Sequence, residues 1–168
     1  MRGDASQSSG RASLREVVGV GPLGALALAL LFWAARTVER SLSLRPLGGP
    51  SPFHDLIAAV LLAVAAIVFW RCVRDMPLPE HGRTLITTGI YRHLRHPRYA
   101  AAVLCVYPAI ALLLHSAPCL TSTALALPLV WAITRLEEGR LVRTFGDEYR
   151  EYMRTTPGFI PKVWHRRR

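Results

Sequence analysis

The sequence predicts an all-α integral membrane protein, a bundle of about four transmembrane helices followed by an amphipathic cytoplasmic helix. Two observations lead to this prediction. The 168 residues are 51% hydrophobic, yet the chain carries a formal net charge of +10. The apolar residues form blocks and the charges lie between and after them, which is typical of membrane proteins. Nucleic-acid binding is not expected, because the arginines flank apolar blocks instead of covering one soluble face.

The first half of the chain predicts a tail and two membrane spans. Residues 1–16 are small and polar and include three arginines, so we expect a mobile tail before a single domain, residues 17–168. The first span would cover residues 17–38, because about twenty residues match a hydrocarbon core of roughly 30 Å. Within it, Gly21 and Gly24 would permit close helix contact. Prolines and glycines then separate it from a second span, residues 56–72, which ends in an aromatic and cationic pair.

The apolar block at residues 99–134 predicts a tight helical hairpin. Its length of about 36 residues is too great for one span. We expect arms at residues 99–114 and 118–134, joined at His115–Pro118, with kinks at Pro108 and Pro128. Beyond Arg135, apolar residues at helical spacing predict an amphipathic helix that is loosened at Gly146. Trp164 and the three terminal arginines predict an anchor at the membrane interface.

The distribution of basic residues predicts the topology. Four spans place both termini on one side of the membrane. The tail holds three arginines, residues 71–98 hold six, and the region from residue 135 holds nine lysines and arginines, whereas the hairpin turn holds none. The positive-inside rule therefore predicts a multi-pass protein with both termini in the cytoplasm. From its compactness we expect a bacterial inner-membrane protein.

The polar stretch Thr87–Tyr99 joins two apolar blocks and is the first candidate site. Gly89 allows a sharp bend, and Pro97 disfavours helix at His96. Aromatic rings here offer faces for a flat heterocycle such as adenine, while arginines or backbone groups meet a carboxylate. The rings belong to Tyr91, His93, His96 and Tyr99. The alternative is a belt of arginines and aromatics at the lipid headgroups, which composition alone favours.

A second candidate site is Arg135-Leu136-Glu137-Glu138, just beyond the last span. Adjacent helix residues point about 100° apart, so one glutamate would face a polar cavity and the other solvent. A glutamate would bind ribose hydroxyls or a cationic group, and Arg135 would orient an anionic substrate. The structural alternative is an Arg135–Glu138 pair across one helical turn. No metal site is predicted, because the histidines lack a carboxylate at ligand spacing.

Taken together, these motifs resemble the isoprenylcysteine carboxyl methyltransferase family of membrane methyltransferases in its compact bacterial form. The resemblance covers residues 87–161, under half the chain. Ala101 departs from it, since the family usually has glycine two residues after the motif tyrosine. The motifs that carry it are Gly89-Ile90-Tyr91-Arg92, Arg95-His96-Pro97-Arg98-Tyr99, and Glu137-Glu138 followed by Leu141, Phe145-Gly146, Glu148-Tyr149, Tyr152 and Pro157 through Pro161.

The resemblance implies S-adenosylmethionine as cofactor, the lipid bilayer as environment and a lipophilic or small methyl acceptor. It implies a cofactor site that includes Arg95, His96, Pro97 and Tyr99, with Gly89 and Tyr91 shaping its wall and Glu137 or Glu138 closing it. Arg135 and Arg95 would meet the anionic group of the substrate, and Arg135 and Glu138 are the catalytic candidates. Such methyl transfer needs alignment and desolvation more than a strong acid or base.

Two other functions stay open at this point. A membrane reductase of the sterol type, which uses NADPH, shares an Arg-His-Pro-x-Tyr stretch, but there Gly-Glu usually follows where this chain has Ala101-Ala102. A membrane scaffold that kept the fold without turnover is the non-enzymatic alternative. The methyl acceptor itself, a carboxylate, thiol or amine, is not predicted.

Overall fold

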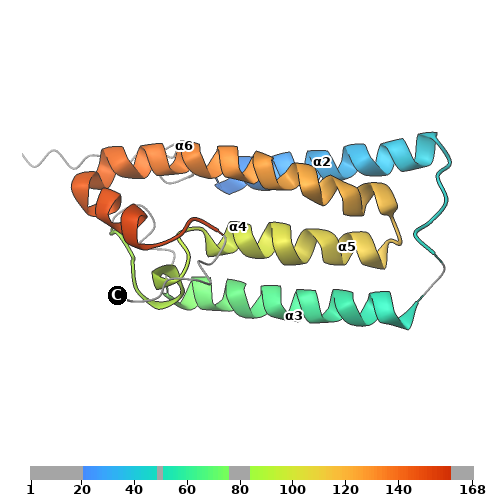
Figure 1. Cartoon of the computed structure of the whole chain (residues 1–168), viewed down its shortest axis with the longest axis horizontal. Helices are drawn as coiled ribbons and strands as arrows, with labels where there is room; N and C mark the ends of the chain where they lie inside the picture. The colour runs from blue at the N-terminus through green and yellow to red at the C-terminus, as the bar shows by residue number, and fades with distance from the viewer. Residues whose placement is uncertain (1–20, 49–50, 76–83, 160–168) are drawn as a thin grey trace, which may run out of the picture.

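The computed structural model describes residues 21–48, 51–75 and 84–159, and every regular element among them is helical. Four helical rods lie side by side, with α2 next to α6 and α3 next to α4 and α5 (Figure 1). This confirms the predicted all-α class. The predicted tail and the C-terminal anchor lie outside the described residues. The elements are α2 (Gly21–Ser41), α3 (Pro52–Asp75), η2 (Gly89–Arg92), α4 (Pro97–Ala101), η3 (Ala102–Val106), α5 (Tyr107–Leu113) and α6 (Ala117–Thr155).

Three of the described helices, α2, α3 and α6, are long and apolar enough to cross a membrane. The fourth rod is the shorter apolar helix Pro97–Leu113, formed by α4, η3 and α5. The first predicted span overlaps α2, which runs on to Ser41, and the second lies within α3, which covers Pro52–Asp75. The bounds of the membrane spans themselves stay a prediction. A proline is tolerated in a first helical turn, and charged residues continue a helix beyond its apolar part.

The hairpin turn lies at the end of the bundle opposite η2, as Figure 1 shows. Ser116 caps α6 by accepting the Cys119 amide at 3.2 Å, and its hydroxyl donates to the Glu39 carboxylate at 2.6 Å. Glu39 also pairs with Arg36 of the same helix. This buried polar cluster connects the end of α2 to the hairpin turn that precedes α6.

The interior of the bundle combines small residues with larger buried ones such as Val103 and Tyr107, and many other large apolar side chains face outward. Ala58, Ala109 and Ala126 are fully buried. On α2, by contrast, one stripe of large side chains is 55–67% exposed, as expected where lipid rather than water is the solvent. The stripe consists of Leu23, Leu26, Leu30 and Trp33.

Gly24 allows α2 to approach the hairpin closely, as predicted. A Cβ atom at this position would lie 2.8 Å from Cε1 of Tyr99, nearer than carbon atoms pack. The glycine therefore accommodates the ring of Tyr99 between α2 and α6. Tyr99 is the last residue of the polar stretch Thr87–Tyr99, hereafter the central stretch, which thus contacts α2.

Two backbone irregularities interrupt the helices, one within the rod Pro97–Leu113 and one in α6. In η3 the Tyr107 amide bonds to the Ala102 carbonyl, a π-helical turn just before Pro108, which has no amide hydrogen. Helix α6 continues through Pro128 to Gly146, whose φ of 59° and ψ of −129° are non-helical. The loosening predicted at Gly146 is confirmed, and the chain turns back there toward the start of α4 (Figure 1). The last span and the amphipathic helix thus form one long helix with a sharp bend.

Candidate functional site

A cavity of about 230 Å³ lies where the start of α4, the charged half of α6 and the returning C-terminal segment meet. It combines two arginines, one carboxylate and two aromatic side chains. These features indicate a ligand with both charged and flat apolar parts. The lining residues are Arg95, Trp131, Thr134, Arg135, Glu138, Gly158 and Phe159.

Glu138 is the centre of this site and is only 5% exposed. Its Oε1 atom lies 2.8 Å from Nη2 of Arg95 and 3.2 Å from Nε2 of His96. Its Oε2 atom lies 3.5 Å from Nη1 of Arg135, so the predicted pair across one helical turn is present. Two guanidinium groups therefore surround a single carboxylate, and the cluster keeps a net positive charge.

The surroundings of Glu138 decide its protonation state. Burial alone raises the pKa of a carboxyl group, but the hydrogen bond with His96 and the positive charges of Arg95 and Arg135 outweigh it and lower the pKa of Glu138 below its ordinary value. Glu138 lies beyond the apolar part of α6, which ends near Thr134. At neutral pH the carboxylate is therefore an anion that accepts hydrogen bonds.

The returning segment forms one wall of the cavity through backbone hydrogen bonds. The Arg95 amide donates to the Pro157 carbonyl and the His96 amide to the Gly158 carbonyl, both at 2.9 Å. His96 is the N-cap of α4, with a φ of −125° and a ψ of 58° that are not helical, and Pro97 occupies the first turn. The proline thus begins α4 directly after the two residues whose amides bond to the returning chain.

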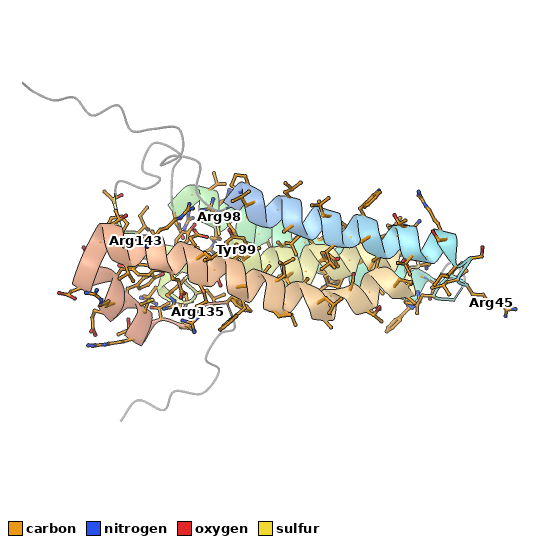
Figure 2. All side chains as sticks on the ribbon, turned by 90° about the horizontal axis from the view of Figure 1, so that it is seen from above. Arg45, Arg98, Tyr99, Arg135 and Arg143 are labelled. Atoms are coloured by element: carbon orange, nitrogen blue, oxygen red, sulfur yellow. The ribbon has the colours of Figure 1, made fainter. Side chains whose placement is uncertain are left out.

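Arg135 lies at the outer side of the cavity. Its guanidinium carbon is 5.2 Å from the centre of the Trp131 ring, a cation–π contact, and Trp131 is 53% exposed. Figure 2 shows Arg135 on the opposite side of α6 from Tyr99. The cation is therefore shared between Trp131 and Glu138, at a part of the site that faces outward.

The structure brings together four of the predicted site residues, Arg95, His96, Arg135 and Glu138, with Pro97 buried beside them. Tyr99 has its ring 6.0 Å from that of His96, but its hydroxyl end points to Gly24 and Ile133. Glu137 lies next to the Tyr99 hydroxyl and does not line the cavity. Glu138 lines the cavity, whereas Glu137 is half-buried and only partly exposed to solvent.

Gly89 and Tyr91 lie apart from the cavity. Gly89 has a φ of +59°, and the next amide, of Ile90, donates to the Asp75 carboxylate at 2.7 Å. Tyr91 is buried, its carbonyl accepts the Tyr152 hydroxyl at 2.5 Å, and burial raises the pKa of its own hydroxyl to about 12. Both residues position the start of the central stretch, and their part in cofactor binding stays a prediction.

Sequence reasoning missed four lining residues, namely Trp131, Thr134, Gly158 and Phe159. Trp131 and Thr134 precede Arg135 and Glu138 by four residues each, so helical spacing from the two charged residues identifies them. Phe159 has no such signal, because it reaches the cavity only after the chain reverses at Gly146.

Comparison with known proteins adds one match. The family model described as phospholipid methyltransferase matches residues 57–148, more than half of the chain. That range includes most of α3, the central stretch, the hairpin and the part of α6 that carries Arg135 and Glu138. No curated protein matches the chain.

Proposed function

The chain belongs to the phospholipid methyltransferase family, part of the isoprenylcysteine carboxyl methyltransferase-like group of membrane methyltransferases, and we propose that it transfers a methyl group from S-adenosylmethionine to a lipophilic acceptor. Family membership confirms the resemblance found in the motifs. The observation that carries the proposal is the Glu138 carboxylate, held by Arg95, His96 and Arg135 on the wall of a cavity with aromatic lining.

The residues of the cavity fit this cofactor. The Nε atom of Arg95 is buried and has no partner, although the same guanidinium binds Glu138 through Nη2. A buried donor without an acceptor costs free energy, and a ligand carboxylate would satisfy it. S-adenosylmethionine, when bound, supplies a methyl group activated by a sulfonium. Trp131 and Phe159 offer the apolar faces that an adenine ring or a sulfonium needs.

In this proposal the protein positions the reacting groups and excludes water from them, and it supplies no acid–base catalyst. Arg95 and Arg135 hold anionic groups, and Glu138 accepts hydrogen bonds from hydroxyl or ammonium groups. His96, 5% exposed, keeps Glu138 oriented through its Nε2 atom. The returning segment at Pro157–Phe159 excludes water from one side, which favours a displacement that requires alignment.

The acceptor is expected to approach from the bilayer. Trp131 and Leu136, on the outward side of α6, are 53% and 66% exposed, which provides an apolar path beside the cavity. We place the cavity and both termini on the cytoplasmic side, following the positive-inside rule. A small acceptor would instead come from that aqueous side.

Calorimetry with the purified chain in detergent tests the cofactor. We expect S-adenosylmethionine to bind, and Glu138→Ala and His96→Ala to weaken binding on the order of tenfold or more, because each removes a partner from the central cluster. Glu148→Ala is the matched control, since Glu148 is exposed on the same helix.

Folded wild-type protein that binds no S-adenosylmethionine would refute the proposal, as would an equal loss in the Glu148→Ala control. The same preparation compares S-adenosylmethionine with NADPH by thermal stabilisation, which separates a methyltransferase from a reductase. Transfer of labelled methyl into a membrane extract, followed by identification of the labelled product, then reveals the acceptor. Binding without transfer would indicate a scaffold.

A further inference from the structure

A second cavity lies between the end of α3 and η2. Its volume is about 390 Å³, and it shares no lining residue with the candidate site. Three of its lining side chains can carry positive charge, and among the described residues that line it none is acidic. The lining residues are Ile67, Val68, Arg71, Gly89, Ile90, Arg92 and His93.

The cavity is at the level where α3 leaves the apolar part of the membrane. Trp70 is 57% exposed and lies between two cations, with the guanidinium carbons of Arg71 and Arg74 at 5.8 Å and 5.2 Å from its ring centre. Tryptophan and arginine together are typical of the headgroup region of a bilayer. A ligand in this cavity would therefore meet the protein at the depth of lipid headgroups.

An apolar stripe on α3 leads directly into the cavity. Val60, Val64 and Ile67 are 44–58% exposed and follow one another at helical spacing, and Arg71 continues the same row. The stripe thus provides a surface for an acyl chain whose end meets the cationic side chains. A soluble anion would gain no binding energy from these apolar side chains, whereas a lipid would.

The wall of the cavity is fixed in place. Asp75 accepts the Ile90 amide at 2.7 Å and is only 11% exposed, so its carboxylate is turned away from the lining and toward the loop. A Cβ atom on Gly89 would overlap that carboxylate, which explains why glycine with positive φ occurs here. Exposed Arg92 and His93 follow on the same short helix and its cap.

We propose that this cavity binds the headgroup of an anionic phospholipid, with the phosphate between Arg71, Arg92 and His93 and an acyl chain along the α3 stripe. Arginine side chains near a membrane surface attract anionic lipids, and a planar guanidinium pairs with phosphate oxygens. The bound lipid would hold η2, and with it the start of the central stretch, against α3.

The test uses the purified full-length chain in detergent with added phosphatidylglycerol or phosphatidylcholine. We expect phosphatidylglycerol to raise the unfolding temperature more and to remain bound in native mass spectrometry. The pair Arg71→Gln and Arg92→Gln should weaken this binding about tenfold or more. The control pair Arg140→Gln and Arg143→Gln removes the same charge from exposed positions of α6 and should leave it unchanged.

Equal weakening in both pairs would overturn the proposal in favour of diffuse surface charge. Equal stabilisation by phosphatidylcholine, or by inorganic phosphate at similar concentration, would also overturn it. A measurement on the wild type guards against misfolded variants: a photoactivatable phosphatidylglycerol should crosslink to α3 between Val60 and Arg71. Crosslinks confined to other helices would contradict the site.

Discussion

Glu137 and Glu138 are adjacent in sequence and enter different environments. Glu138 meets Arg95, His96 and Arg135, whereas Glu137 lies beside the Tyr99 hydroxyl on the side covered by α2. The helical rotation of about 100° between neighbours separates them. A single residue, rather than the acidic pair, therefore organises the candidate site.

The ionised form of Glu138 should contribute stability in a pH-dependent way. Because its folded pKa is lowered, this contribution is present above its ordinary pKa near 4.5 and is lost as the pH falls through the folded value. We expect Glu138→Gln to cost on the order of 1–3 kcal/mol at pH 7, since Arg95 stays buried without its anion. The difference from wild type should shrink below pH about 4.5.

Thermal unfolding of the wild type and Glu138→Gln between pH 7 and pH 3.5 measures this pH-dependent difference in stability. Glu148→Gln serves as the control, because Glu148 is exposed and should leave the stability nearly unchanged. A wild-type advantage over Glu138→Gln that stays constant across the whole range would contradict an ionised, paired Glu138.

At the scale of elements, the bend in α6 completes the site. Without it, the helix would carry Tyr152 and Phe159 away from the bundle. The Tyr152 hydroxyl instead bonds to the Tyr91 carbonyl, and Pro157 and Gly158 accept the amides of the central stretch. The non-helical conformation of Gly146 therefore brings the C-terminal segment to the cavity, which is otherwise lined by α6 and by Arg95 at the start of α4.

Gly146→Ala should disturb this return. The φ of 59° and ψ of −129° suit glycine alone, so we expect a cost on the order of 1–3 kcal/mol. Gly139→Ala, in regular helix with open space around it, should instead gain about 0.5–1 kcal/mol.

Chemical unfolding measures both substitutions, and hydrogen exchange at the Arg95 and His96 amides reports on the returning segment. These amides should exchange faster in Gly146→Ala and at the wild-type rate in Gly139→Ala. If both alanines behaved alike, the bend would not depend on the glycine conformation.

At the scale of the whole molecule, the candidate site and most of the arginines in the described residues lie at one end of the bundle. Figure 2 shows Arg143 at the end that holds Arg135 and Arg45 at the opposite end. At the opposite end, the buried polar contact is the hydrogen bond between Ser116 and Glu39. The arginines that line the candidate cavity, Arg95 and Arg135, are not at that end. This polarity matches a protein that meets its cofactor from one side of a membrane.

Cysteine labelling tests the predicted topology. In a background with Cys105→Ser, we expect a membrane-impermeant maleimide to label Arg45→Cys in intact cells and Arg143→Cys only after permeabilisation, because the positive-inside rule places Arg143 in the cytoplasm. Cys72 and Cys119 are buried and should give little background. The reverse labelling pattern would place the site on the outer side and exclude a cytoplasmic cofactor.

Local sequence patterns predict the all-α class, the hairpin turn near His115, the bend at Gly146 and the two segments that meet at the candidate site. These depend on local properties: the length of apolar runs, the conformations open to proline and glycine, and the spacing of charges along one helix. Even the Arg135–Glu138 pair follows from spacing, since one turn separates the two residues.

Three features follow from the packing of the helices and could not be predicted: Glu138 rather than Glu137 lines the cavity, Tyr99 packs on Gly24, and Phe159 joins the lining. The contact between His96 and Glu138 joins residues 42 positions apart. Such a contact depends on how α4 and α6 are rotated and how far the chain returns after Gly146. Packing of whole helices sets those quantities, and no local pattern in the sequence contains them.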